Sequence, residues 1–132
     1  MESPEEIRET EIAPEGYVAP EINACVFRAG GVTFSVPVEE LIEIVEVSEI
    51  IPLPGSPDYL LGIAHYRGKA VPVIDLGFLE GEHAVKKPEW LVVIQTGDEV
   101  MGIAVEEMPD LRRDFEGKDI SASEIYTKYR IT

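Results

Sequence analysis

The residues of this sequence that could do chemistry are scattered and lack the spacings that catalysis requires. His65 and His83 have no cysteine or second histidine at the close spacing typical of zinc sites. Cys25 stands between apolar residues, where a cysteine usually packs as a small hydrophobe. The sequence has no glycine-rich phosphate-binding loop and no Gly-x-Ser-x-Gly motif. We therefore expect no catalytic activity, no cofactor and no metal site.

Carboxylates are abundant but are not spaced as a reacting pair. Adjacent residues of a strand point to opposite faces, so a sequence cluster does not bring two acids together. We interpret the cluster as a solvated acidic face. The alternative is an acidic docking surface that steers a basic partner. Neither interpretation implies a reaction. The residues concerned are Glu39, Glu40, Glu43, Glu46 and Glu49.

Length and charge limit the class of protein. The chain has 132 residues, which suits one or two small units. Lys and Arg total 11 against 26 Asp and Glu, giving a net charge of −15. Such a charge repels phosphate, which disfavours nucleic acids and acidic membranes as partners. The sequence contains neither a signal-peptide pattern nor an apolar run of ~18 residues, so we expect a cytoplasmic protein without membrane insertion.

The first 22 residues differ in composition from the rest. They carry seven Glu against a single Arg, with three Pro and isolated apolar residues. Such a segment cannot bury enough apolar area to offset its ordering entropy, so we predict an acidic disordered tail over 1–22. The alternative is an arm that recruits a partner. We assign residues 23–132 to one domain.

From Asn23 onward, stretches rich in Val and Ile alternate with Gly and Pro, a pattern typical of a mainly β barrel or sandwich. Two-residue turn signals separate paired stretches, because Gly accepts positive φ at no steric cost. We predict three hairpins, over 24–36 with Gly30-Gly31 at the turn, over 61–75 with Arg67-Gly68, and over 90–105 with Gly97-Asp98.

The remaining segments give one more strand, two loops and a final strand. Residues 42–47 mix apolar residues with Glu and suit a half-exposed strand. Prolines make 51–58 a loop, and 77–88 a second loop with a helical turn near 77–81. Alternation of apolar and polar residues over 125–131 predicts one last strand.

The sequence contains an internal repeat. A shift of 67 residues places Cys25-Val26-Phe27 on Val92-Val93-Ile94 and Gly30 on Gly97. Two similar halves predict two similar small barrels, although chance can also produce so short a match. The counterpart of Arg67-Gly68 and of 69–76 would lie beyond Thr132, so we expect the second half to be incomplete.

Several motifs in order identify a family resemblance. From Ala24 to about Met108 the chain resembles the CheW-like domain, the chemotaxis coupling protein family. The motifs are Ile44-Val45-Glu46-Val47, Ile51-Pro52-Leu53-Pro54-Gly55, Leu61-Gly62-Ile63, Arg67-Gly68, Pro72-Val73-Ile74-Asp75-Leu76 and Met101-Gly102-Ile103-Ala104-Val105-Glu106.

The resemblance implies two SH3-like β-barrels without catalytic activity, the second shortened at the C-terminus. It also implies an adaptor that joins the cytoplasmic tips of methyl-accepting chemotaxis receptors to the regulatory domain of a CheA-type histidine kinase. His65-Tyr66 departs from the Asn-Leu usual before Arg-Gly. The alternative is an adaptor of another pathway, such as twitching or gliding motility, or one that retains a single partner.

The family pattern also implies a partner-binding site. It places Arg67 on the coupling surface and associates Glu43 with partner binding, while Gly68 belongs to the turn. The alternative is that Arg67 only covers a barrel end. Binding at the centre should be largely apolar, because exposed charge pairs contribute only ~0–1 kcal/mol each. We expect two or three of the following anchors to be exposed and the others to be core: Val36, Leu41, Ile44, Val47, Ile63 and Tyr66.

Overall fold

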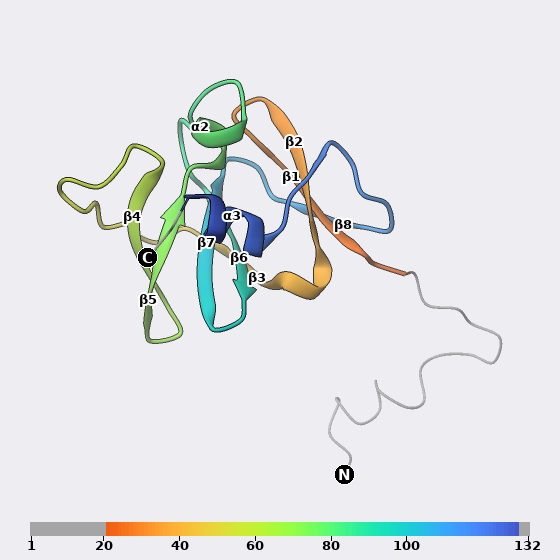
Figure 1. The fold of residues 1–132 in the computed structure, drawn as a ribbon, viewed down its shortest axis with the longest axis horizontal. Coiled ribbons are helices and arrows are strands. Elements are labelled where there is room, and N and C mark those ends of the chain that lie inside the picture. Colours follow the sequence, from red (N-terminus) through yellow and green to blue (C-terminus); the bar gives the residue numbers. More distant parts are fainter. Residues whose placement is uncertain (1–20, 130–132) are drawn as a thin grey trace, which may run out of the picture.

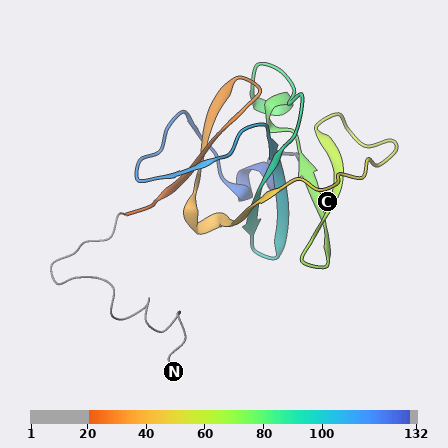
Figure 2. The same cartoon turned by 180° about the vertical axis from the view of Figure 1, so that it is seen from behind.

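In a computed structural model, residues 21–129 form two β-sheets and two α-helices (Figure 1). Residues 1–20 and 130–132 lie outside the described part of the chain, and most of the predicted acidic tail lies there. The β1–β2 hairpin (Ala24–Ala29 and Val32–Pro37) and the β4–β5 hairpin (Leu60–Tyr66 and Lys69–Ile74) lie on opposite sides of the molecule, as the front and rear views both show (Figures 1 and 2).

The first sheet has four strands in the order β8-β1-β2-β9. Its outer strands are short, β8 covering Asp110–Arg112 and β9 Lys118–Asp119. Gly30 and Gly31 form the turn between β1 and β2 with φ of +58° and +80°. Both values lie in the region that glycine enters freely, which confirms the hairpin predicted there.

The second sheet has five strands in the order β3-β6-β7-β5-β4. It confirms the other two hairpins and the strand predicted over 42–47. A short 3-10 helix, η1 (Val38–Glu40), precedes this strand. The helical turn predicted after the 61–75 hairpin is the helix α2 (Leu76–Glu80). The remaining strands of this sheet are β3 (Leu41–Glu46), β6 (Trp90–Thr96) and β7 (Glu99–Val105).

The second sheet closes into a barrel. The chain leaving β3 at one edge reaches Ile51, which pairs with Ile63 of β4 at the other edge. Each of these residues donates its N–H to the other's carbonyl at 2.8 Å. Gly62 makes the close approach possible, because a Cβ there would meet the Ile51 carbonyl oxygen at 2.2 Å. Barrel closure therefore brings β3 and β4 together although they are not neighbours in the sheet.

The sheet topology agrees with the internal repeat. The β1–β2 and β6–β7 hairpins are each the centre of a sheet, with an antiparallel neighbour on the first strand and a parallel neighbour on the second. The strand that follows each hairpin joins the other hairpin's sheet: β3 pairs with β6, and β8 pairs with β1. The two halves of the sequence therefore exchange strands.

The exchange corrects our expectation of where the repeat ends. In the first sheet β9 lies parallel to β2 and is followed by a helix, as β5 lies parallel to β7 and is followed by α2. The counterpart of β5 is therefore inside the chain. Only the β4 strand and the Arg67-Gly68 turn have no counterpart in the other half of the sequence, because the segment between β8 and β9 is too short to hold a hairpin. The shortened sheet is the one that contains β1 and β2.

The final strand predicted over 125–131 is wrong, because the chain there forms the helix α3 (Ala122–Tyr129). Ser121 caps it: its Oγ accepts from the N–H of Glu124 and donates to the Glu124 carboxylate, both at 3.1 Å. Ala122 and Ile125 are buried, and Tyr126 and Tyr129 pack beside them, which is helical spacing. The helix packs on β6 (Figure 1).

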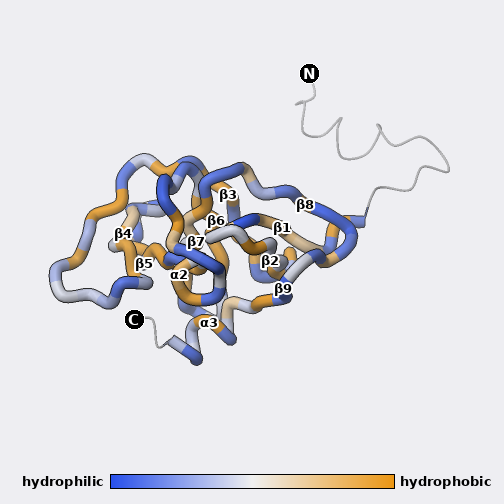
Figure 3. The backbone as a smooth tube through the Cα atoms, turned by 90° about the horizontal axis from the view of Figure 1, so that it is seen from above, coloured by the Kyte–Doolittle hydropathy of each residue, from blue (hydrophilic) through white to orange (hydrophobic). Residues whose placement is uncertain are grey.

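The central strands of the barrel are buried on both faces. Leu91 and Val93 of β6 point into the barrel, whereas Val92 and Ile94 face the first sheet and α3. Residues 91–94 of β6 and 100–105 of β7 accordingly show no alternation of hydrophobic and polar residues. Hydrophilic residues are frequent in the outer loops (Figure 3). The first sheet is thus stacked on the outside of the barrel through one shared core.

Glu80 at the end of α2 holds the last turn of α3. Its carboxylate accepts hydrogen bonds from the Tyr129 hydroxyl and, at 3.0 Å, from Lys128 Nζ. It also lies 3.4 Å from Lys118 Nζ on β9. The Tyr129 hydrogen bond, followed by the Lys128 contact, lowers the pKa of Glu80. One carboxylate therefore links three elements.

The β1–β2 turn packs closely against the backbone of α2 and of the loop after it. We therefore predict that Gly30→Ala destabilises the protein. A Cβ at Gly30 would lie 2.1 Å from the His83 carbonyl oxygen and 2.6 Å from Gly77 Cα. The matched control is Gly97→Ala, where φ is +57° and no atom lies within 4 Å. We expect the control to lose ~1–2 kcal/mol from backbone strain. Gly30→Ala should lose a further ~2 kcal/mol from overpacking. Urea unfolding measures both, and equal losses would contradict this close packing.

The assignment of α3 predicts that Ser121→Ala lowers the free energy of unfolding by ~1 kcal/mol, because the helix loses its N-cap. Ser123, an exposed residue of the same helix, provides the control. Ser123→Ala should be neutral or slightly stabilising, since alanine is the better helix former. Urea unfolding followed by circular dichroism compares the two, and a cost no larger at Ser121 would argue against the cap.

Candidate functional site

Barrel closure brings Glu43, Tyr66 and Arg67 together at one end of the barrel. Glu43 belongs to β3, whereas Tyr66 and Arg67 end β4 and begin its turn. The Tyr66 hydroxyl donates to Glu43 Oε1 at 2.6 Å, and Arg67 Nη2 donates to the same oxygen at 2.8 Å. The Arg67 guanidinium carbon lies 5.4 Å from the centre of the Tyr66 ring. We call these three residues the Arg67 cluster.

The hairpin turn fixes where Arg67 projects. Arg67 has φ of +51° and Gly68 has φ of +79°, so both central residues adopt the left-handed conformation that a tight two-residue hairpin turn requires. For glycine this conformation carries no steric cost, but for arginine it costs roughly 1–2 kcal/mol. Arg67 is the single non-glycine residue with positive φ in residues 21–129. Such strained residues are often found at functional sites.

The cluster keeps each group in one protonation state. Hydrogen bonds from Tyr66 and then Arg67 lower the pKa of the Glu43 carboxyl, so it stays ionised. Partial burial, together with the bond to Glu43, raises the pKa of the Tyr66 hydroxyl, which stays a donor. The hydrogen bond to Glu43 likewise raises the pKa of Arg67. Because the pKa of folded Glu43 is lowered, the interaction is complete above the ordinary carboxyl pKa and is lost as the pH falls through the folded value.

The Arg67–Glu43 ion pair is too exposed to contribute much to folding stability, so stability does not account for the Arg67 cluster. The Arg67 side chain is 71% exposed and Glu43 is 39% exposed, and ion pairs of this kind add little to folding. Within residues 21–129 the guanidinium donates to a side chain only through Nη2, and to Glu43. The other N–H groups of Arg67 are held in a fixed direction and can bond to an acceptor on another molecule.

The apolar anchors expected around the site divide into three groups. Val36 is fully buried in the shared core, so it cannot contact a partner in this structure. Leu41 and Ile44 of β3 are partly buried against the same core. Val47 packs against the barrel interior, and Ile63 is partly exposed next to the Ile51 bridge. Val36 is therefore one of the anchors that belong to the core, because the inner faces of both sheets are covered.

Sequence reasoning missed the apolar residues that are exposed near the barrel closure. Ile42, Ile51 and Leu53 are each about 40% exposed, at 38%, 42% and 38%. An open groove of about 370 Å³ lies next to Ile51 along the chain, lined by Val47, Ser48, Glu49, Ile50, Leu61 and Pro88. Ile42 sits at the register shift between Leu41 and Glu43, which turns it outward. No sequence signal marks that irregularity.

The other candidates for chemistry do not converge. Burial raises the pKa of the Cys25 thiol to about 11, which disfavours a nucleophilic thiolate. His65 is exposed on β4, and His83 contacts the Ala84 carbonyl oxygen. Among residues 21–129 no three His, Cys, Asp or Glu side chains gather as a metal site would require.

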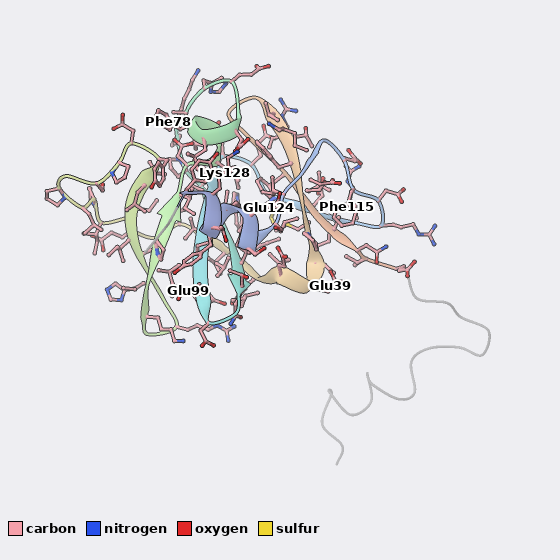
Figure 4. The ribbon with its side chains drawn as sticks, in the orientation of Figure 1. Glu39, Phe78, Glu99, Phe115, Glu124 and Lys128 are labelled. Carbon is pink, nitrogen blue, oxygen red and sulfur yellow. The ribbon has the colours of Figure 1, made fainter. Side chains whose placement is uncertain are left out.

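The acidic residues grouped in the sequence also separate in space. Glu40 accepts a hydrogen bond from the backbone N–H of Ala122 at 2.7 Å and so holds the start of α3. Glu43 belongs to the Arg67 cluster. Glu39, labelled in Figure 4, is exposed on η1, and Glu46 and Glu49 are exposed as well. No two of these five carboxylates therefore form a converging acidic pair.

Comparison with known proteins gives a consistent result. The family model of the CheW-like domain matches residues 23–127. "Protein FrzA" of Myxococcus xanthus is 34% identical over 108 residues, covering 77% of this chain and 68% of FrzA. "Protein PilI" of Pseudomonas aeruginosa is 33% identical, covering 62% of this chain and 47% of PilI. "Chemotaxis protein CheW" of Rhizobium meliloti is 30% identical, covering 64% and 56%.

A solved structure supports the fold. The scaffolding protein TtCheW from Thermoanaerobacter tengcongensis superposes with a TM-score of 0.59 at 20% identity, covering 76% of this chain and 68% of that one. The chain spans about half the length of the PilI and CheW relatives it matches. Of the helices in residues 21–129, none has the length and apolar character to cross a bilayer.

The geometry predicts that Tyr66→Phe raises the pKa of Glu43 toward the ordinary carboxyl value, because the carboxylate loses its principal hydrogen-bond donor. NMR titration of the Glu43 side-chain carboxyl carbon measures this pKa. Tyr126→Phe is the control, since Tyr126 belongs to α3 and does not bond to Glu43. An unchanged Glu43 pKa in Tyr66→Phe would show that the hydroxyl does not hold the carboxylate.

Proposed function

The chain belongs to the CheW-like domain family, and we propose that it is a non-catalytic adaptor coupling chemoreceptors to a histidine kinase. The partners would be the cytoplasmic tip of a methyl-accepting chemotaxis receptor and the regulatory domain of a CheA-type kinase. The observation that supports this proposal most is the Arg67 cluster, because it holds an exposed arginine in a strained, fixed conformation without a stabilising benefit.

A fixed guanidinium suits the recognition of another protein. Binding usually costs the freedom of a long side chain, and that cost falls when the side chain is already held. Glu43 and the Tyr66 ring hold Arg67 from two sides, and its remaining N–H groups can donate to a carboxylate or carbonyl. We assign to Arg67 the main polar contact with one partner, and to Glu43 and Tyr66 its positioning.

The apolar residues near the barrel closure supply the rest of the proposed contact. Ile42, Ile51 and Leu53 are exposed, and the neighbouring groove includes Val47. Binding energy concentrates in a few buried anchors that polar contacts surround. Leu41, Ile44 and Ile63 are partly buried and stay candidates at the margin of this surface.

Two further features agree with an adaptor. The thiol of Cys25 is buried and its pKa is raised, and Glu40 and Glu43 make separate contacts. We also propose that the protein acts in the cytoplasm and that residues 23–132 form the coupling domain.

An adaptor of another signalling pathway is a second candidate. FrzA and PilI, at 34% and 33% identity, are at least as similar to this chain as the CheW of Rhizobium meliloti at 30%. The fold and the Arg67 cluster fit either role. The identity of the kinase that binds therefore separates the two.

Calorimetric titration tests the proposal. The purified chain is titrated with the regulatory domain of each CheA-type kinase of the same organism, and separately with a receptor tip fragment. We expect binding to one kinase domain and to the receptor fragment. Binding of neither, by a sample whose fold is verified, would contradict the coupling function.

The same assay predicts that Arg67→Ala weakens one of these interactions by more than ~1 kcal/mol, as an interface hot spot should. Arg28→Ala is the matched control, because Arg28 is an exposed arginine of the first sheet that bonds Thr33 at 2.9 Å. Its affinity for the same partner should be unchanged. Equal affinity in folded Arg67→Ala would remove Arg67 from the interface.

A further inference from the structure

The edge strand β8 offers a second surface, separate from the Arg67 cluster. β8 is the outer strand of the first sheet and pairs on one side with β1. Within residues 21–129 no strand lies on its other side. Both views place β8 on the opposite side of the molecule from the β4–β5 hairpin (Figures 1 and 2). An unpaired edge is a template for pairing with another strand.

The backbone of Leu111 faces away from the sheet. The Arg112 carbonyl accepts from the Asn23 N–H at 2.9 Å and so points toward β1. Successive residues of a strand direct their backbone groups to opposite sides, so the N–H and C=O of Leu111 point outward. One residue of β8 is thus ready to exchange two hydrogen bonds with a neighbouring strand.

Several large apolar side chains are exposed around this edge, among charged residues. Leu111 lies opposite Cys25 on the core side of the sheet, yet it is 47% exposed. Met108 before the strand is 61% exposed, and Phe115 after it is 42% exposed. Figure 4 shows Phe115 on the loop beside β8. Half of the large hydrophobic side chains exposed in residues 21–129 belong to this region, the fourth being Ile22 next to Asn23.

The charges of β8 complement a second copy of the same strand. The strand reads Asp110-Leu111-Arg112. Antiparallel pairing centred on Leu111 sets Asp110 of each copy opposite Arg112 of the other. These flanking pairs are the non-hydrogen-bonded ones, in which side chains approach most closely. Parallel pairing would oppose like charges, and opposite charges across a sheet stabilise it while like charges destabilise it.

We propose that this protein forms a symmetric dimer in which β8 of one copy pairs antiparallel with β8 of a second copy. The two-fold axis passes between the two Leu111 residues, whose backbones exchange two hydrogen bonds. The four-stranded sheets become one eight-stranded sheet, and the exposed Met108 and Phe115 side chains contribute apolar area beside the axis. An interface with the same patch on both sides is the usual form of a two-fold dimer.

The dimer is expected to be weak. The paired strands are short, and each copy carries a net charge of −15, so the two copies repel one another. Asp110 and Arg112 already contact within one chain at 3.3 Å, and Arg112 also pairs with Glu116 of the same chain, so pairing between copies competes with contacts that each chain makes alone. A dissociation constant on the order of 100 µM suits an interface of this kind.

Sedimentation equilibrium of the full chain at 0.15 M salt, from 10 µM to 1 mM, tests the proposal. We expect reversible dimerisation over this range. Leu111→Lys should abolish it, since two lysines would meet at the axis. Phe78→Lys is the control: Phe78 is 48% exposed on α2, away from β8 (Figure 4), and its substitution should leave dimerisation unchanged. A chain that stays monomeric at 1 mM would overturn the proposal.

Charge exchange makes the test specific to the pairing. Asp110→Arg alone opposes two arginines at each flanking pair and should weaken the dimer about tenfold, as should Arg112→Asp alone. The double variant with both substitutions restores opposite charges and should recover the original affinity. Failure of the double variant to recover, in a chain shown to be folded by circular dichroism, would overturn the antiparallel arrangement, as would a dimer that Leu111→Lys leaves intact.

Discussion

Closure of the five-stranded sheet is the constraint on which the rest of the structure depends. Two hydrogen bonds between Ile51 and Ile63 join the ends of a sheet whose outer strands, β3 and β4, are separated by three others. Closure creates the barrel interior and places Glu43 against Tyr66 and Arg67. It also leaves the outer faces of β6 and β7 free to support the first sheet and α3. A single contact between chain segments thus organises both the core and the proposed binding surface.

The sequence was sufficient where structure is decided by neighbouring residues. All three hairpins follow from turns such as Gly30-Gly31, because two-residue turns need positive φ. The sequence was insufficient where the paired strands are distant in the chain. Which sheet β3 and β8 join depends on which faces are buried, and no local sequence pattern predicts this. The helix α3 was mistaken for a strand because its residues also alternate, although Ser121 and Glu124 at the spacing of a capping box could have identified it.

The candidate site was predicted in part. The family resemblance supplied Arg67 and Glu43, and the structure places them in contact at 2.8 Å. Tyr66 was noticed as a departure from the family pattern, yet its bond to Glu43 depends on barrel closure and could not be inferred from spacing. Which of the anchors would be core, as Val36 is, could not be decided beforehand, because apolar strand residues look alike in sequence whether they face a partner or a second sheet.

The most direct test of this account is the pKa of Glu43 in Gly62→Ala, measured by NMR. A Cβ at Gly62 of β4 would meet the Ile51 carbonyl oxygen at 2.2 Å and open the closure, whereas Gly55→Ala, in the 51–58 loop that begins at Ile51, has φ of +81° and no atom within 4 Å and so adds strain alone. The account predicts that the Glu43 pKa rises to the ordinary carboxyl value in Gly62→Ala and stays low in Gly55→Ala. A low Glu43 pKa in folded Gly62→Ala, with the Ile51 and Ile63 amides exchanging freely, would show that the site does not depend on closure.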